Sequence, residues 1–342
     1  MNRITLDDIF SEQNTDKALK LVVCKNATPG LDGMHASELP EYWRSHKRSI
    51  LEDINRGDYA PTPLNLFFIP KPGKKEKRQI CVCTATDQML QHCIRFELEK
   101  YFTPRFHSHS YGFIKGRGTE DALKQCIQYM NCGMTYVIDA DIRKCFDSIK
   151  HRIVAYQIGK VAKGGVTNLI SKYLKNPCRL GNGYRYHRVG LPQGSCMSPV
   201  IANIVLNDLD WHLHRRHIAF VRYADDLVIF NRTLQDAEKT MGELNHYLET
   251  CLSLRLNPEK TSIIQGEALS YLGHSFTRMG KRYHLSINDE IKTRMLEKMV
   301  RHVNKRDAEI TEMLDRLGTF NRGWMNYYER VCSAHMKPFI ED

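Results

Sequence analysis

The chain has 342 residues, 42% of them hydrophobic, so it can bury the core of one large domain or of two to three ordinary ones. Its 50 Lys and Arg residues outnumber 39 Asp and Glu residues, and the net charge of +11 favours a polyanionic partner, nucleic acid rather than a membrane surface. These values exclude a disordered or fibrous chain.

The sequence contains neither a membrane span nor a secretion signal. No apolar run approaches the roughly 20 residues that cross a bilayer, and the start MNRITLDDIFSEQ is too polar for a signal peptide. We therefore expect a cytoplasmic protein without a membrane partner.

The chain has 11 cysteines, an odd number, and many lie in apolar segments. Reduced core thiols are therefore favoured over disulfides. Cys81 and Cys83 share one face of a predicted strand, but no second cysteine pair with zinc-ligand spacing accompanies them, which disfavours a metal site. The cysteines assigned to core segments are Cys24, Cys93, Cys126, Cys145 and Cys251.

The first group of predicted elements starts with a hairpin. Residues 65–83 read NLFFIPKPGKKEKRQICVC, two β-rich runs joined by Pro, Gly and charged residues. A helix follows over TDQMLQHCIRFELEKYF, with Thr86 as its expected N-cap. In the next stretch, SYGFIKGRGTEDALKQCIQYM, three glycines precede a second helix whose expected cap is Thr119. We expect these elements to form one compact unit.

The second group alternates strands and helices. The strand MTYVIDAD leads through IRKCFDSIKHRIVAYQI to GLPQGSCMSPVIANIVLNDLDWHLHRR, a Gly/Pro turn that feeds a long helix. FVRYADDLVIF reads as strand, two-residue turn and strand, and DAEKTMGELNHYLETCLSL as a helix with Met241, Leu244, Leu248 and Leu252 on one face. This order indicates an α+β layer with helices on one face of an antiparallel sheet.

The third group is helical. SINDEIKTRMLEKMVRHVNKR opens with Ser286 and Asp289 at the spacing of a capping box, so a helix is expected to begin there. One face of this helix is basic, and both a solvated face and a face along a sugar-phosphate backbone fit the pattern. The basic residues are Lys292, Arg294, Lys298, Arg301, Lys305 and Arg306.

Three aspartates end strand-like runs: Asp141 after TYVIDA, and Asp225 with Asp226 at the tip of VRYADDLVIF. Burial and mutual repulsion both oppose ionisation of adjacent aspartates unless a cation is present. Hard divalent cations take oxygen ligands, and Mg²⁺ combines one or two carboxylates with substrate phosphates. Three carboxylates that converge from neighbouring strands can hold two Mg²⁺ ions, the arrangement that polymerases use for in-line phosphoryl transfer.

The tetrad Tyr223-Ala224-Asp225-Asp226 between two strand-forming runs resembles the active-site hairpin of reverse transcriptases. Other blocks follow in the order of that family and cover most of residues 28–330. TPGLDGM, GLPQGS and FNRGWMNYY point to bacterial group II intron-type reverse transcriptases. The remaining blocks are IPKP with Arg78, SYGFIKGRGTEDAL, DIRKCFDSIKH, the extension SCMSPVIANIVL, LNPEKTSI and LSYLGHSF.

The resemblance implies an α+β right-hand polymerase fold with fingers, a palm made of an antiparallel sheet with helices on one face, and a helical thumb. The implied ranges are 1–130 for the N-terminal segment and fingers with palm elements, 131–275 for the palm, and 276–342 for the thumb. Because the chain stops soon after FNRGWMNYY, we expect a standalone enzyme without the DNA-binding and endonuclease regions. We carry over neither maturase nor integration function.

The implied activity is that of an RNA-directed DNA polymerase, which extends a 3′-hydroxyl and releases pyrophosphate. By resemblance, Asp141, Asp225 and Asp226 are the catalytic carboxylates and the ligands of two Mg²⁺ ions, for which Mn²⁺ can substitute. The main chain of Ile142 is a further candidate ligand. Asp139 and Asp147 are then structural.

Four residues are implied as nucleotide contacts. A bulky ring at Phe146 would collide with a ribose 2′-hydroxyl and so select deoxynucleotides, although a plain core role for this ring stays open. Lys71 and Arg78, on the arms of the hairpin, are assigned to the triphosphate. Gln193 sits in a turn before a helix, where it can contact the nucleotide.

The implied template and primer contacts are Arg117, Tyr223, Lys260, Lys298 and Arg301. The expected partners are an RNA template, the RNA-DNA duplex, deoxynucleoside triphosphates and a dedicated noncoding RNA, and the expected setting is bacterial antiviral defence. Three alternatives stay open: a CRISPR-associated or retron-like reverse transcriptase, an RNA-templated RNA polymerase, and a catalytically silent RNA-binding scaffold with a polymerase fold.

Overall fold

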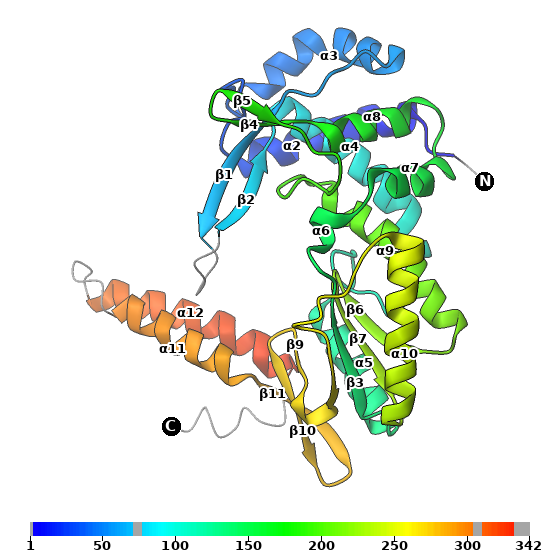
Figure 1. Ribbon diagram of the computed structural model, residues 1–342. Coiled ribbons are helices and arrows are strands. Elements are labelled where there is room, and N and C mark those ends of the chain that lie inside the picture. Colours follow the sequence, from blue (N-terminus) through cyan, green and yellow to red (C-terminus); the bar gives the residue numbers. More distant parts are fainter. Residues whose placement is uncertain (1–2, 71–76, 304–309, 332–342) are drawn as a thin grey trace.

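Helices and a small sheet build one end of the molecule in the computed structural model, which describes residues 3–70, 77–303 and 310–331 (Figure 1). Helix α2 packs against α4, and α7 and α8 return to this end from later in the chain, where α8 contacts α3. Leu39, Met89 and Ile158 are fully buried in the shared core. The helices are α1 (Leu6–Ile9), α2 (Glu12–Lys25), α3 (Leu39–Arg56), α4 (Ala85–Phe102), α7 (His151–Gly159) and α8 (Gly165–Lys175).

The predicted hairpin over 65–83 is confirmed as two antiparallel strands in which Leu66 faces Cys81 and Ile69 faces Arg78. Two short strands from much later in the chain extend it into a sheet of order β2-β1-β4-β5, and β4 runs parallel to β1. The strands are β1 (Leu64–Pro70), β2 (Lys77–Val82), β4 (Cys178–Leu180) and β5 (Gly183–Arg185).

The caps of two predicted helices differ from expectation. Helix α4 begins two residues earlier, because Thr84 is extended and its hydroxyl accepts a hydrogen bond from the Asp87 backbone N–H at 3.1 Å. Thr86 lies inside the first turn instead. Helix α5 (Thr119–Asn131) has Gly118 as its N-cap, whose N–H donates to the Asp121 carboxylate at 2.9 Å.

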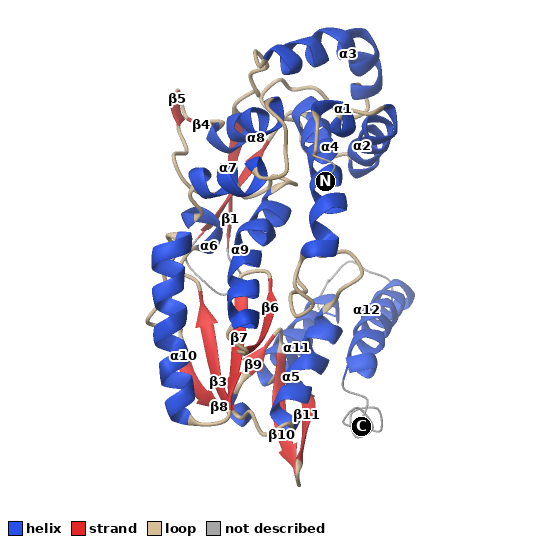
Figure 2. Ribbon diagram, turned by 90° about the vertical axis from the view of Figure 1, so that its right-hand side faces the viewer, coloured by secondary structure: helices blue, strands red, loops and turns tan. Residues whose placement is uncertain are grey.

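A second antiparallel sheet of order β6-β7-β3-β8 carries the predicted strand, turn and strand. Its side chains alternate between two hydrophobic clusters, so both faces are covered: Ile138 and Ile229 face α9 and α10, whereas Val137 and Val228 face α5 (Figure 2). The elements are β3 (Tyr136–Asp141), α9 (Ser198–Arg215), β6 (Ala219–Tyr223), β7 (Asp226–Asn231), α10 (Leu234–Tyr247) and β8 (Ser262–Gln265).

Helices α9 and α10 are the predicted helical layer, and Leu244, Leu248 and Leu252 are buried against the sheet as expected. Helix α10 passes directly into the π-helical turn η2 (Leu248–Leu252). The opposite face, which the sequence left open, is covered by α5 and by a third sheet. That sheet comprises β9 (Ser270–Tyr271), β10 (His274–Met279) and β11 (Arg282–Ile287).

The helix expected to begin at Ser286 begins three residues later. Ser286 belongs to β11 and its hydroxyl donates to the Ser275 carbonyl of the neighbouring strand at 3.4 Å, so the predicted capping box is wrong. Helices α11 (Asp289–Val303) and α12 (Ile310–Val331) then pack against each other and extend toward the side on which the β1–β2 hairpin lies (Figure 1). The remaining short elements are η1 (Thr103–Arg105), α6 (Cys145–Ser148) and η3 (Gly266–Ala268).

The cysteines in the described residues are free thiols. Cys93, Cys126 and Cys145 are buried as predicted, but Cys24 and Cys251 are exposed on the surfaces of α2 and η2, so their assignment to the core is wrong. Within the part of the chain that the structure describes, no helix is long and apolar enough to cross a membrane.

Candidate active site

The three predicted carboxylates lie together at one end of the four-stranded β6-β7-β3-β8 sheet. Tyr223 and Asp226 are the last facing pair of the β6–β7 hairpin, so Ala224 and Asp225 form its two-residue turn. Asp141, the last residue of β3, faces Asp226 across the strand pair. The register therefore brings Asp141 beside the aspartates of the turn, as the sequence predicted.

Negative charge accumulates at this end of the sheet. Burial raises the pKa of Asp225, and the charge of Asp141 raises it further. The pKa of Asp226 rises to about 6, first through burial and then through the charges of Asp225, Asp139 and Asp141. Ionisation of Asp226 therefore opposes folding as the pH rises from the ordinary value of 3.8 to about 6, unless a cation offsets it.

Among the described residues, the predicted template/primer contact Lys260 forms an ion pair with one of these carboxylates. The Lys260 ammonium lies 3.4 Å from Asp141 Oδ1, and its side chain is 59% exposed. The Asn257 amide donates to Asp141 Oδ2 at 3.1 Å, and the Asp141 backbone N–H donates to the Thr261 hydroxyl at 3.2 Å. Asp141 is thus held in place by the loop before β8.

The donor set fits a hard divalent cation. Four carboxylates, including that of Asp139, gather where Lys260 supplies one positive charge, and their oxygens are the ligand type that Mg²⁺ and Mn²⁺ prefer. Asp139 raises the pKa of Asp226 although the sequence assigned it only a structural role. Ile142 is buried and pairs through its backbone with Leu256.

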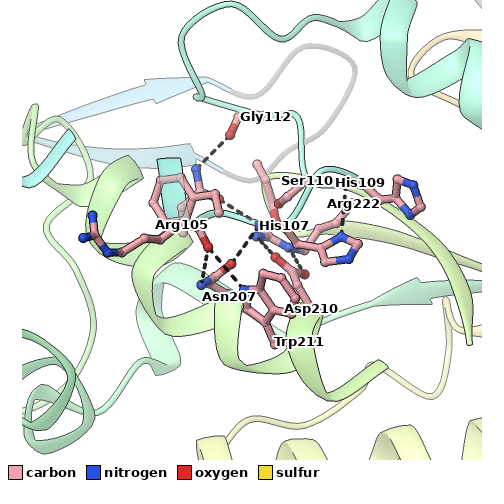
Figure 3. A network of polar contacts seen from close by, with 12 residues as sticks. Arg105, His107, His109, Ser110, Gly112, Asn207, Asp210, Trp211 and Arg222 are labelled. Carbon is pink, nitrogen blue, oxygen red and sulfur yellow. Dashed lines mark hydrogen bonds and ion pairs between the residues drawn. The ribbon is translucent and has the colours of Figure 1, made fainter. Parts of the chain in front are cut away.

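A fully buried arginine, Arg222, holds the turn of the β6–β7 hairpin (Figure 3). Arg222, 0% exposed, donates from Nε to Asp210 Oδ1 at 2.7 Å and from Nη2 to Asp210 Oδ2 at 2.6 Å. Its Nη1 donates to Asn203 Oδ1 at 2.8 Å and to the Ala224 carbonyl at 2.7 Å. This bidentate pair joins the turn to α9. The sequence reasoning missed it, although a lone arginine inside the apolar run FVRYADD was a usable signal.

The face of α9 that contacts Arg222 also contacts Gly112, the first of the three glycines. The Asn203 amide donates to the Gly112 carbonyl at 2.8 Å, and the Tyr111 N–H donates to the Arg222 carbonyl at 2.9 Å. A Cβ atom at Gly112 would lie 2.3 Å from the Ala224 nitrogen, so only glycine fits against the turn. Ala224 itself has φ of 59°, a left-handed conformation that is uncommon for alanine.

Arg117, predicted as a template contact, is turned toward its own chain. Its guanidinium donates to the carbonyls of Ser110 at 2.6 Å and Phe106 at 3.3 Å, and also to the carbonyl of His107. These bonds support the segment that contacts the turn. A template contact for Arg117 stays a prediction.

A chain of hydrogen bonds joins the aspartate strand to the hairpin of the small sheet. Phe146 lies on α6, just after β3, and its carbonyl accepts from the Leu191 N–H at 2.7 Å. The Gln193 amide donates to Asp147 Oδ1 at 3.3 Å, and the Gln193 carbonyl accepts from the Cys81 N–H on β2 at 2.7 Å. The predicted nucleotide contacts Phe146 and Gln193 are therefore neighbours along this connection.

The structure describes the other predicted nucleotide, template and primer contacts in less detail. Tyr223 is half-buried in the hydrophobic cluster between the main sheet and β9–β11, and the Tyr271 hydroxyl beside it donates to the Asp226 carbonyl at 3.2 Å. Lys298 is exposed on α11. Three predicted contacts have side chains that lie outside the described part of the structure: Lys71, Arg78 on β2 and Arg301 on α11.

Comparison with known proteins identifies the family. Residues 69–276 match the reverse transcriptase (RNA-dependent DNA polymerase) family, and residues 292–342 match the group II intron maturase-specific domain. Because the first match spans more than half of the chain, the chain belongs to the reverse transcriptase family. It is therefore an RNA-directed DNA polymerase by family, and the matched region contains Asp141, Asp225 and Asp226.

Individual relatives are distant. Protein YkfC of Escherichia coli is 27% identical over 296 residues, 75% of this chain and 77% of that protein. The group II intron-encoded protein LtrA of Lactococcus lactis is 30% identical over 184 residues, 53% of this chain but only 30% of its own length. A telomerase structure from Candida albicans aligns with a TM-score of 0.53 and 11% identity, over 87% of this chain and 61% of that one, which supports the predicted right-hand polymerase fold.

The buried ion pair leads to the first prediction. Asp210→Ala leaves the Arg222 guanidinium buried without its carboxylate, which should lower the free energy of unfolding by about 3–5 kcal/mol. The melting temperature, measured by calorimetry, should fall by roughly ten degrees.

Two matched variants control this measurement. Glu52→Ala removes the exposed Arg48–Glu52 pair and should cost less than about 1 kcal/mol. The double variant Asp210→Leu with Arg222→Met removes both charges and should be more stable than Asp210→Ala alone. If Asp210→Ala melts no lower than Glu52→Ala, the pair does not anchor the hairpin.

Proposed function

We propose that this reverse transcriptase copies an RNA template into cDNA at the end of the main sheet, with Asp141, Asp225 and Asp226 as catalytic carboxylates that hold two Mg²⁺ ions. The observation that carries the proposal is the register that sets Asp141 opposite Asp226, with Asp225 in the adjoining turn. Bound Mg²⁺ would activate a primer 3′-hydroxyl and neutralise the leaving pyrophosphate.

The protein groups have separate tasks in this proposal. The three carboxylates supply the oxygen ligands, and the buried Arg222 keeps the turn in place against their repulsion. Lys260 contacts Asp141 from the loop behind the site and limits the negative charge there. Gln193, held by Asp147, and Arg78, on β2, are assigned to the incoming deoxynucleoside triphosphate.

We assign residues 1–130 to the fingers with palm elements, 131–275 to the palm and 276–342 to the thumb. Two features of the fold qualify these ranges. Helix α8 contacts α3 and strand β4 pairs with β1, although both lie within 131–275. The boundary between residues 275 and 276 also divides β10, so the β9–β11 sheet is better kept whole as the base of the thumb.

The double variant Asp225→Ala with Asp226→Ala tests the carboxylates. Loss of several kcal/mol of transition-state stabilisation should lower primer extension on an RNA template about a thousand-fold or more. Binding of the RNA-DNA duplex should persist, because most of its affinity comes from backbone contacts. Extension that continues at the normal rate would show that the metal site lies elsewhere, whereas a wild-type protein without extension would support the silent scaffold.

Phe146 is proposed to exclude ribonucleotides. The ring is half-buried on α6, directly after the strand that carries Asp141. Phe146→Ala should raise incorporation of ribonucleotides relative to deoxynucleotides by ~10–100-fold, the range that one pocket contact commonly provides.

Single-nucleotide extension with each substrate measures this ratio. Phe106→Ala, which removes a buried ring in the segment after η1, is the matched control and should leave the ratio unchanged. An unchanged ratio in Phe146→Ala would instead favour the core role of the ring. Efficient use of ribonucleotides by the wild-type protein would favour the RNA-templated RNA polymerase.

The template is proposed to be a dedicated noncoding RNA in antiviral defence, a setting that rests on the sequence resemblance alone. A second candidate is recognition of intron RNA, favoured by the match of residues 292–342 to the maturase-specific domain. Crosslinking the protein to RNA in cells and sequencing the attached RNA separates them. A single abundant noncoding species supports the first, and spliced intron sequences support the second.

A further inference from the structure

Three metal-ligating side chains meet in the small β2-β1-β4-β5 sheet, away from the carboxylates. Cys81 lies on β2, Cys178 on β4, and His187 shortly after β5. The two Sγ atoms are 3.2 Å apart, and Cys178 Sγ lies 3.1 Å from His187 Nε2. The three ligand atoms all lie within 4.8 Å of one another. Both cysteines are buried, and His187 is half-buried.

The sheet register explains why these distant residues meet. Cys81 faces Leu66 of β1, whereas Cys178 pairs with Leu64 on the same strand, two residues away and therefore on the same face. Cys178 also faces Arg185 of β5, and the chain that leaves β5 returns His187 to the cysteines. Sequence spacing could not reveal this, because Cys178 and Cys81 are 97 residues apart.

The geometry suits zinc. Tetrahedral Zn²⁺ binds sulfur at ~2.3 Å and nitrogen at ~2.0 Å, which places its ligand atoms roughly 3.6–3.8 Å apart. The observed separations of 3.2 and 3.1 Å therefore need to widen by only about half an ångström, within the reach of side-chain rotation. Two thiolates and one imidazole are a zinc donor set, and a water would complete four-coordination.

The two sulfurs are close enough for a hydrogen bond, which either thiol can donate. A hydrogen bond from the Cys81 thiol lowers the pKa of Cys178 most, and His187 and Arg185 lower it further. The same hydrogen bond and burial raise the pKa of Cys81. Zn²⁺ binds both sulfurs as thiolates, so each thiol proton is released as its Zn–S bond forms.

We propose that Cys81, Cys178 and His187 form a zinc site that clamps β2 to the β4–β5 hairpin. The site also reaches the loop with Gln193, because the Cys81 N–H donates to the Gln193 carbonyl and a Cβ atom on Gly194 would lie 2.4 Å from the Cys81 carbonyl oxygen. Arg78 precedes Cys81 by three residues on the same strand. A bound ion therefore stiffens the backbone that positions Gln193 and Arg78. The role of these two residues as nucleotide contacts rests on the proposed function.

Metal binding is tested with the full chain carrying Asp225→Ala and Asp226→Ala, which removes two of the four active-site carboxylates, and excess Mg²⁺ competes for the other two. The protein is stripped with a chelator under phosphine reductant and titrated with Co²⁺ in excess Mg²⁺. We expect one cobalt ion per chain, a thiolate-to-cobalt charge-transfer band in the near ultraviolet, and displacement of that band by Zn²⁺. Zinc should also raise the melting temperature.

Three further substitutions sharpen the test. Cys178→Ser and His187→Ala should lower the affinity for Co²⁺ at least ~100-fold, because even changes that merely reorient a ligand lower metal affinity ~10–100-fold. Cys24→Ser alters an exposed thiol on α2 and should bind Co²⁺ normally. If Cys178→Ser does not fold, His187→Ala carries the test, because that side chain is half-exposed.

Two results would overturn the proposal. One is the absence of a stoichiometric cobalt band when Cys81, Cys178 and His187 are all present, or the persistence of that band in both Cys178→Ser and His187→Ala. The other is a Cys81–Cys178 disulfide that resists the reductant, detected by mass spectrometry. Because neither readout requires cDNA synthesis, failure of the zinc site is distinguishable from failure of the proposed polymerase function.

Discussion

The buried ion pair between Arg222 and Asp210 is the constraint on which the candidate active site depends. Both side chains are fully buried, and one guanidinium satisfies the Asp210 carboxylate, the Asn203 amide oxygen and the Ala224 carbonyl. A buried arginine in this position would be costly without all of these partners. Its geometry therefore admits essentially one placement of the turn relative to α9, which is what a site built from converging carboxylates requires.

The turn needs such an anchor because its own conformation is unfavourable. Ala224 has a positive φ, Asp225 and Asp226 repel each other, and burial raises the pKa of both carboxyl groups. Gly112 also packs so closely against one side of the turn that a Cβ atom would not fit there. Contacts made outside the turn offset these unfavourable energies. The surrounding fold therefore holds the turn in its strained conformation.

Sequence patterns predicted some of the elements but not the contacts between them, and they missed α1–α3 and the β9–β11 sheet. The β1–β2 and β6–β7 hairpins and helices α4, α9 and α10 are predicted because periodicity and turn residues are local signals. The Thr84 cap and the true start of α11 were missed, since competing cap residues lie within two or three positions of each other. The inward turn of Arg117 and the meeting of Cys178 with Cys81 depend on segments tens of residues apart, which spacing alone cannot specify.

The two ends of the candidate site are mechanically coupled through short polar contacts. From Asp141 the chain enters α6, whose Phe146 and Asp147 hold the loop at Leu191 and Gln193, and that loop in turn holds Cys81 of β2. Displacing β2 from the carboxylates would break these bonds in succession and leave backbone groups without partners. These bonds therefore fix β2 relative to the loop that carries Gln193, so the residues assigned to the nucleotide share one support.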